Sequence, residues 1–211
     1  MARDYMPISI AMSGRNCLIV GGGKIALRKI EILLNYEAKI TVIAPEIDKK
    51  IEYFAESKKV SLKKREYKAS ESSMYGLVIS ASGDEAVNQK VADDCSEAGI
   101  PVNVVDNPAL CSFIFPAVLK RDILTVAVSS DGKAPFFSSN IRMILEDIFP
   151  ENWKNIAAKA AEFRNMVMEK YPKDYSARDK CFEKFLAADW KEILKKKDSD
   201  VIKKEMESML E

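Results

Sequence analysis

The chain has 211 residues, 47% of them hydrophobic, which is enough for one large domain or for a cofactor-binding domain with a smaller appendage. Its 33 Lys and Arg nearly balance its 32 Asp and Glu, so the composition does not indicate a protein that binds nucleic acid or another polyanion. Histidine is absent and the four cysteines form no C-x-x-C pair, so we expect no metal site.

The N-terminal segment does not have the pattern of a secretory signal. Residues 1–14 contain neither a continuous apolar core nor a small-residue cleavage site. No apolar run approaches the ~18 residues that are typical of a membrane span. These features predict a cytoplasmic protein with no membrane partner, whose cysteines are reduced thiols.

The first half of the chain alternates short apolar runs with amphipathic stretches. Five runs have the length and composition of buried strands: 16–20, 39–44, 60–67, 77–82 and 101–105. Three stretches between them have the pattern of helices: 24–36, 46–58 and 84–98. Strand–helix alternation at this pitch predicts an α/β fold with a Rossmann-type parallel sheet covered by helices.

The pattern changes after residue 110. Two apolar runs, 113–119 and 123–129, are joined by Lys120-Arg121-Asp122 and predict an antiparallel hairpin outside the parallel sheet. The apolar face of such a hairpin must be covered, and a second subunit is a natural cover. We therefore expect a homodimer.

From about Ser138 onward the chain has the amphipathic pattern of helices. The predicted helices are 138–149, 151–170, 175–187 and 189–210. The sequence thus predicts three regions, namely a Rossmann domain at 1–112, a dimerisation region at 113–150 and a helical C-terminal domain at 151–211.

The main functional motif follows the first predicted strand. Gly21-Gly22-Gly23-Lys24-Ile25-Ala26 fits the dinucleotide-binding pattern G-x-G-x-x-A. The first glycine allows a tight turn, Gly23 lets the backbone approach a pyrophosphate, and Ala26 lets the helix pack closely on the strand. The helix N-terminus then faces the phosphates with free N–H groups. A glycine-rich turn with no ligand is the alternative.

Glu46 is the only carboxylate near the end of the second predicted strand, where a Rossmann domain bonds the ribose of its cofactor. It either bonds the ribose 2′-OH or lies in solvent. Neither Ala44 nor Pro45 is an arginine that could hold a 2′-phosphate, so the sequence favours NAD over NADP.

Two further strand ends are expected at the same edge, because an open parallel sheet places its ligand outside the carboxyl ends of the strands. Ala81 and Ser82 follow the fourth strand, and Val104 ends the fifth. Asp106 is therefore expected near the nicotinamide, where a substrate would bind. Its alternative role is structural, as a turn-forming residue before Pro108.

Four segments carry a more specific signal: MPISIAMSGRNCLIVGGGKIALRK, ITVIAPE, NVVDNPALCSFIFPAVLKRD and LTVAVSSDGKAP. Together they resemble the precorrin-2 dehydrogenase / sirohydrochlorin ferrochelatase family of siroheme synthesis. The resemblance covers residues ~5–150. The run from the glycines to Arg28-Lys29 and the pattern VVD-x-P-x-x-x-SFIFPA are much more specific than a generic Rossmann match.

The resemblance implies a dehydrogenase that converts precorrin-2 and NAD+ to sirohydrochlorin and NADH. It implies NAD contacts at four positions: Lys24, Ile25, Pro45 and Glu46. It makes Asp106 the key acid–base residue and places Ser130 in the tetrapyrrole-binding part of the cleft. The substrate carries many carboxylates, which need cationic partners. The candidates are Arg28, Lys120 and Arg121, with Lys133 and Arg142, each of which taken singly is more often a solvated surface charge.

Alternatives to this function stay open. Members of the family differ in whether they also insert Fe2+ into sirohydrochlorin, and Asp106 could accept the displaced pyrrole protons. The chain could instead be a non-catalytic NAD-sensing Rossmann regulatory module, against which the hairpin and the helical region argue. The sequence leaves no room for the methyltransferase domain of trifunctional siroheme synthases, so we expect no methylation.

Overall fold

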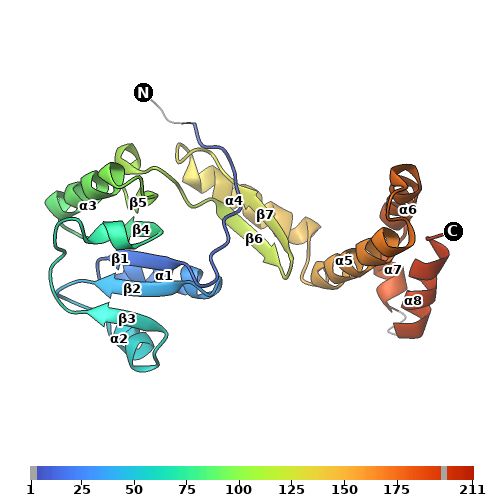
Figure 1. Cartoon of the computed structure of the whole chain (residues 1–211), viewed down its shortest axis with the longest axis horizontal. Coiled ribbons are helices and arrows are strands. Elements are labelled where there is room, and N and C mark those ends of the chain that lie inside the picture. Colours follow the sequence, from blue (N-terminus) through green and yellow to red (C-terminus); the bar gives the residue numbers. More distant parts are fainter. Residues whose placement is uncertain (1–3, 196–198) are drawn as a thin grey trace. The chain divides into compact units, whose positions relative to one another are not determined.

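The computed structural model describes residues 4–195 and 199–211, and its elements are labelled in Figure 1. By its internal contacts the chain forms two compact units, one ending at Phe115 and the other beginning at Pro116. Each unit has its own hydrophobic core, so the two are described separately. None of the helices in the described ranges is long and apolar enough to cross a membrane.

The first unit is built on a parallel sheet of five strands in the order β3-β2-β1-β4-β5. The strands are β1 (Asn16–Val20), β2 (Lys39–Ile43), β3 (Val60–Lys63), β4 (Leu77–Ser80) and β5 (Val102–Val104). The helices are α1 (Lys24–Leu34), α2 (Lys49–Glu56) and α3 (Glu85–Glu97), with short 3-10 turns η1 (Glu71–Met74) and η2 (Pro108–Leu110). Every strand pairing is parallel, which confirms the predicted Rossmann-type α/β fold.

The central strand β1 is buried on both faces of the sheet. Successive side chains of a strand point to opposite faces. Ile19 packs in one core cluster with Ile30 of α1, and Val20 packs in the other with Val91 of α3. A strand covered on both sides needs apolar residues on both faces, which explains why β1 shows no alternation with polar residues.

Some elements of the first unit are shorter than the sequence predicts. The predicted helix 46–58 begins only after Asp48, whose side chain accepts a hydrogen bond from Lys50 N at 2.8 Å and caps α2. The predicted strand 60–67 ends early, because Arg65 N donates to Lys63 O and turns the chain. β4 is likewise two residues shorter than predicted.

The second unit begins with an antiparallel hairpin of β6 (Ala117–Arg121) and β7 (Leu124–Val128). The prediction that the first strand starts at residue 113 is wrong, because Phe113 and Phe115 pack against the core of the first unit. The turn contains Asp122 at φ 56°, a left-handed conformation that Asp tolerates better than most residues. Leu119 of β6 is buried, and the hairpin contacts α4 (Pro135–Ile148).

The remaining helices of the second unit share one hydrophobic core that contains Phe163, Val167 and Phe185. They are α5 (Trp153–Lys170), α6 (Tyr175–Ala187), α7 (Trp190–Lys195) and α8 (Ser199–Ser208). The predicted helix 189–210 corresponds to α7 and α8, and residues 196–198 between them lie outside the described residues. This unit runs to the last residue without a division at 150, so a separate dimerisation region stays a prediction.

All four cysteines are free and buried in the hydrophobic interior. Cys17 and Cys95 belong to the two core clusters of the first unit, and Cys181 belongs to the core of the second. Burial raises the pKa of Cys17 and of Cys95 to about 11.

Candidate functional site

The topology brings several loops to one edge of the first unit's sheet. Because the strands are parallel, the turns that follow β1, β2, β4 and β5 all leave the sheet at its carboxyl edge. The chain order reverses between β1 and β4, since the strands on one side come earlier in the sequence than those on the other. In open α/β sheets this reversal creates a crevice that binds ligands.

The first two glycines after β1 are required by close backbone packing. Gly21 has φ 119°, and a Cβ added there would lie 2.3 Å from Ala81 O in the turn after β4. A Cβ on Gly22 would lie 2.1 Å from Glu46 O in the turn after β2. Both positions exclude a side chain because the three turns meet here, so these glycines build the turn whether or not a ligand binds.

Gly23 differs from its neighbours because the surrounding protein leaves room for a side chain at this position. It is exposed, and no atom lies within 4 Å of a Cβ built on it. It is the N-cap of α1, where no side chain bonds the free N–H groups of the first turn and no acidic residue lies nearby in that turn. Open space before an uncapped, positively polarised helix end is what a pyrophosphate needs. Lys24 and Ile25 are exposed in the same turn.

Pro45 and Glu46 are exposed at the edge of this turn. The backbone holds them there, because Asp48 N donates a hydrogen bond to Gly22 O at 2.8 Å. No residue in the described part of the chain bonds the Glu46 carboxylate. Its position beside the glycine turn is compatible with both interpretations of the sequence, a bond to a ribose hydroxyl or a solvated charge.

The turn after β4 is held by Asn88 of α3, a residue that belongs to none of the sequence motifs. Buried Ser80 donates its hydroxyl to Asn88 Oδ1 at 2.7 Å, and Asn88 Nδ2 donates to Ser82 O at 3.0 Å. Ala81 N donates to Val20 O at 2.7 Å, which ties the turn to β1. The polar Ser80 inside an apolar strand was the one sequence signal that a partner must exist.

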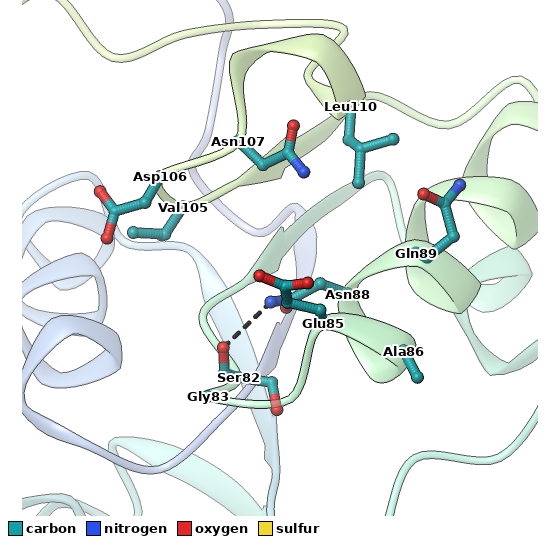
Figure 2. Close-up of a pocket in the computed structure, with 10 residues that line it drawn as sticks. All are labelled: Ser82, Gly83, Glu85, Ala86, Asn88, Gln89, Val105, Asp106, Asn107 and Leu110. Atoms are coloured by element: carbon teal, nitrogen blue, oxygen red, sulfur yellow. Dashed lines mark hydrogen bonds between the residues drawn. The ribbon is translucent and has the colours of Figure 1, made fainter.

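A cavity of about 520 Å³ lies between this turn and the turn after β5 (Figure 2). Ser82, Gly83 and Asn88 line one side of it, and Asp106 and Asn107 line the other. It lies at the β4 and β5 end of the carboxyl edge, beyond the glycine turn. A Rossmann domain that binds a dinucleotide across its crevice would place one half of the cofactor at this end.

Val104 does not line this cavity. Its side chain is 2% exposed in the core, its N–H donates to Cys111 Sγ at 3.2 Å, and its carbonyl accepts a hydrogen bond from the same sulfur at 3.2 Å. A side-chain contact between Val104 and a cofactor is therefore excluded by packing. The next residue, Val105, lines the cavity instead.

Asp106 occupies the turn after β5 with φ 60° and an exposed side chain. Its carboxylate bonds no backbone group among the described residues, so it does not close the turn as a turn-forming aspartate would. The turn is held by Cys111, whose thiol donates to Val104 O and lies 3.4 Å from Asn107 O. Figure 2 shows the carboxylate directed away from Gln89 and Leu110.

A partly buried lysine of α1, Lys29, is electrostatically coupled to this turn. Its Nζ lies 4.0 Å from the centroid of the Phe115 ring, a cation–π contact. Burial and the neighbouring Arg28 lower the pKa of Lys29, while Cys111 and Asp106 oppose this change. Lys29 lies in one of the segments that resemble the family, but its place in the sequence alone predicts no role for it.

The other predicted substrate cations differ in their surroundings. Arg28 is exposed on α1 and Lys120 is exposed on β6. Arg121 has a side chain only 13% exposed, donates from Nε to Phe149 O at 2.9 Å and lies 3.6 Å from Glu151. These contacts stabilise the end of α4, and a role of Arg121 in substrate binding stays a prediction.

Ser130 lies in the loop between β7 and α4. Its hydroxyl oxygen accepts hydrogen bonds from Ala134 N at 3.1 Å and from the buried Ser138 hydroxyl at 2.9 Å. These bonds fix the Ser130 side chain at the beginning of α4. Arg142, on the same helix, pairs with Glu146 at 2.5 Å. In the described ranges, no three Cys, Asp or Glu side chains are gathered as a metal site.

The comparison with protein families agrees with the geometry of the glycine turn. Residues 8–117 match the model of a family described as "Putative NAD(P)-binding". The chain belongs to this family. The match spans the whole parallel sheet and ends at the first residue of β6, so the matched segment contains both the glycine turn and Asp106.

Two siroheme synthases are similar to this chain over most of its length. The siroheme synthase of Pseudomonas paraeruginosa is 41% identical over 169 residues, which are 80% of this chain and 36% of that protein. The siroheme synthase of Methylococcus capsulatus is 39% identical over 175 residues, 83% of this chain and 37% of that protein. The chain thus spans little more than a third of the length of these relatives.

The solved structure of a protein named "SirC, precorrin-2 dehydrogenase" has the same fold. The TM-score is 0.75 over 97% of this chain and 98% of that chain, at 22% sequence identity. The similarity covers both units, so the helical second unit as well as the Rossmann-type unit follows a known arrangement of elements.

Proposed function

We propose that this protein is an NAD-dependent dehydrogenase that converts precorrin-2 to sirohydrochlorin. The observation that carries the proposal is the pairing, at one sheet edge, of an open glycine turn at Gly23 with a cavity lined by Asp106. The names of the relatives, siroheme synthase and precorrin-2 dehydrogenase, give the substrate class.

The residues at the glycine turn fit a dinucleotide. The N–H groups of the first turn of α1, at Lys24 and Ile25, are directed at the open space before Gly23 and would bind the pyrophosphate. Glu46 would accept a hydrogen bond from the ribose, and the lack of a cation at Pro45 favours NAD over NADP. When bound, the nicotinamide supplies the hydride acceptor.

Asp106 is the proposed general base. Dehydrogenation removes a hydride and a proton from the substrate, and a carboxylate can take the proton. Among the described residues no other group bonds the Asp106 carboxylate, so its lone pairs are available to a substrate. Because the chain has no histidine, a carboxylate is the best-suited side chain for this task near neutral pH.

The test is a turnover assay. The protein is mixed with NAD+ and enzymatically made precorrin-2, and the absorbance of sirohydrochlorin and of NADH is followed. Equal amounts of the two products are expected. Binding of NAD+ without any turnover would refute the proposed dehydrogenase activity and would support the alternative, a non-catalytic NAD-sensing module. Repeating the assay with Fe2+ and purified sirohydrochlorin tests the ferrochelatase step, in which Asp106 would take the pyrrole protons.

We also propose that the protein acts as a homodimer in the cytoplasm, without a nucleic-acid or membrane partner. The support is an exposed apolar stripe on α4, in which Phe136 is 79% exposed. The exposed apolar residues of the helix are Phe136, Phe137, Met143, Ile144 and Ile148. Their spacing places them along one side of the helix, where a second copy of the chain would cover them.

A further inference from the structure

Lys29 is a residue near the site to which the proposed reaction gives no task. It lies on α1, and its side chain is partly buried and contacts Phe115, the last residue of the first unit. Within the described residues its ammonium group has no hydrogen-bond or ion-pair partner, although a lysine has three N–H donors. Its side chain is only partly buried, and Nζ is not one of the fully buried side-chain atoms that lack a partner, so the ammonium group keeps contact with solvent.

The surroundings of Lys29 are poorly suited to a charge that serves only the fold. Burial removes water from the ammonium, and the adjacent Arg28 repels it; both effects lower the pKa of Lys29. The Phe115 ring, 4.0 Å from Nζ, orients the group but offers no hydrogen-bond acceptor. An apolar side chain would pack at this place without these penalties. A cation kept here needs an anionic partner from elsewhere.

Two anions could supply that partner, the pyrophosphate of the cofactor and a carboxylate of the substrate. The pyrophosphate has its own donors at the start of α1, about one and a half helical turns before Lys29. The charges of Asp106, in the turn after β5, and of Cys111, just beyond η2, instead act on Lys29 and oppose the lowering of its pKa. The Asp106 carboxylate faces away from the α3 side of the cavity, as Figure 2 shows. The position of Lys29 thus favours the substrate.

We propose that Lys29 is a substrate-binding residue whose ammonium group binds a carboxylate of the tetrapyrrole beside Asp106. The inference rests on the proposed function for the identity of the substrate. Binding an anion there would give the ammonium the partner it lacks, while Phe115 keeps it in place. It would also fix one edge of the macrocycle relative to the base, which is how a positioned substrate gains rate.

The test compares Lys29→Met, which keeps the apolar stem, with Lys29→Arg, which keeps the charge. The control is Lys90→Met on α3, an exposed lysine that does not line the cavity. Calorimetry with sirohydrochlorin, the stable tetracyclic product, should show about a 10-fold or greater loss of affinity for Lys29→Met, in line with a lost charge-assisted hydrogen bond. Lys29→Arg and Lys90→Met should stay within about 3-fold of wild type.

Titration with NAD distinguishes the two candidate partners of Lys29, the pyrophosphate of the cofactor and a carboxylate of the substrate. The NAD affinity of Lys29→Met should match wild type, and a selective loss of NAD affinity would overturn the inference by assigning Lys29 to the pyrophosphate. Unchanged sirohydrochlorin affinity in Lys29→Met would overturn it as well. If wild type binds sirohydrochlorin through Lys29 but does not turn over precorrin-2, the proposed dehydrogenase fails and the inference stands.

A second measurement covers the case in which Lys29→Met does not fold. Wild-type protein is labelled with an amine-acylating reagent with and without sirohydrochlorin, and the modified lysines are quantified by mass spectrometry. Lys29 should be protected by the ligand and Lys90 should not. Equal labelling of Lys29 in both samples would contradict the inference.

Discussion

Replacing Gly23 with Asp should separate cofactor binding from stability. Gly23 has φ −88° and ψ −171°, which any residue can adopt, and a side chain there meets no atom within 4 Å. Asp is a preferred N-cap residue and gains a few tenths of a kcal/mol over Gly. In a chain of this size such a gain shifts Tm by only about 1 °C. Thermal unfolding of Gly23→Asp should therefore equal that of wild type or be slightly higher.

The same substitution should remove NAD binding. The new carboxylate would bond the N–H groups of the first turn of α1 and place a negative charge where the pyrophosphate belongs. Losing about two charge-assisted hydrogen bonds at roughly 1.5 kcal/mol each corresponds to ~100-fold in affinity. Isothermal titration calorimetry with NAD measures this directly. A folded Gly23→Asp protein with wild-type NAD affinity would refute the assignment of the glycine turn to the cofactor.

Three further predictions concern the glycine turn, Asp106 and the exposed side of α4. Gly21→Ala should destabilise the fold by roughly 2–3 kcal/mol, because its Cβ would overlap Ala81 O, and an unchanged Tm would contradict this. Asp106→Asn and Asp106→Ala should each lower turnover about 100-fold. Only the Ala variant should also lose about 1 kcal/mol of stability, since Asn tolerates φ 60°; near-normal turnover by the Asn variant would place the base elsewhere. Sedimentation of the wild-type protein should show a dimer. Ile144→Ser on α4 should dissociate this dimer, whereas Leu186→Ser on α6 should not. A monomeric wild-type protein at micromolar concentration would contradict the predicted dimer.

The Rossmann-type fold could be predicted because its signals are local. The strand run before Gly21 ends where β1 ends, and the helical spacing after Gly23 begins where α1 begins. The apolar run 113–119 was harder to interpret, because hydrophobicity shows that a residue is buried but not which core buries it. Phe113 and Phe115 complete the first unit, and only the residues after Pro116 form the hairpin.

The supporting residues of the site could not be predicted, because their roles depend on contacts between distant segments. Asn88 is recognisable only once α3 is placed against the turn after β4. Cys111 bonds both Val104 and Asn107, which requires the chain to fold back from η2 onto β5. The environment of Lys29 depends on its contact with Phe115, which is 86 residues further along the chain. The hydrophobic periodicity of the sequence does not predict such contacts.

The burial of every cysteine gives the protein built-in reporters of local opening. A thiol reacts as the thiolate, and burial both shields Cys17 and raises its pKa, so a disulfide exchange reagent can modify it only after the surrounding core opens. Cys17, Cys95 and Cys111 lie in the first unit, and Cys181 lies in the second. The rates at which the four thiols are modified, resolved by peptide mapping, therefore report the opening of each unit separately, and a bound dinucleotide would slow only those of the first.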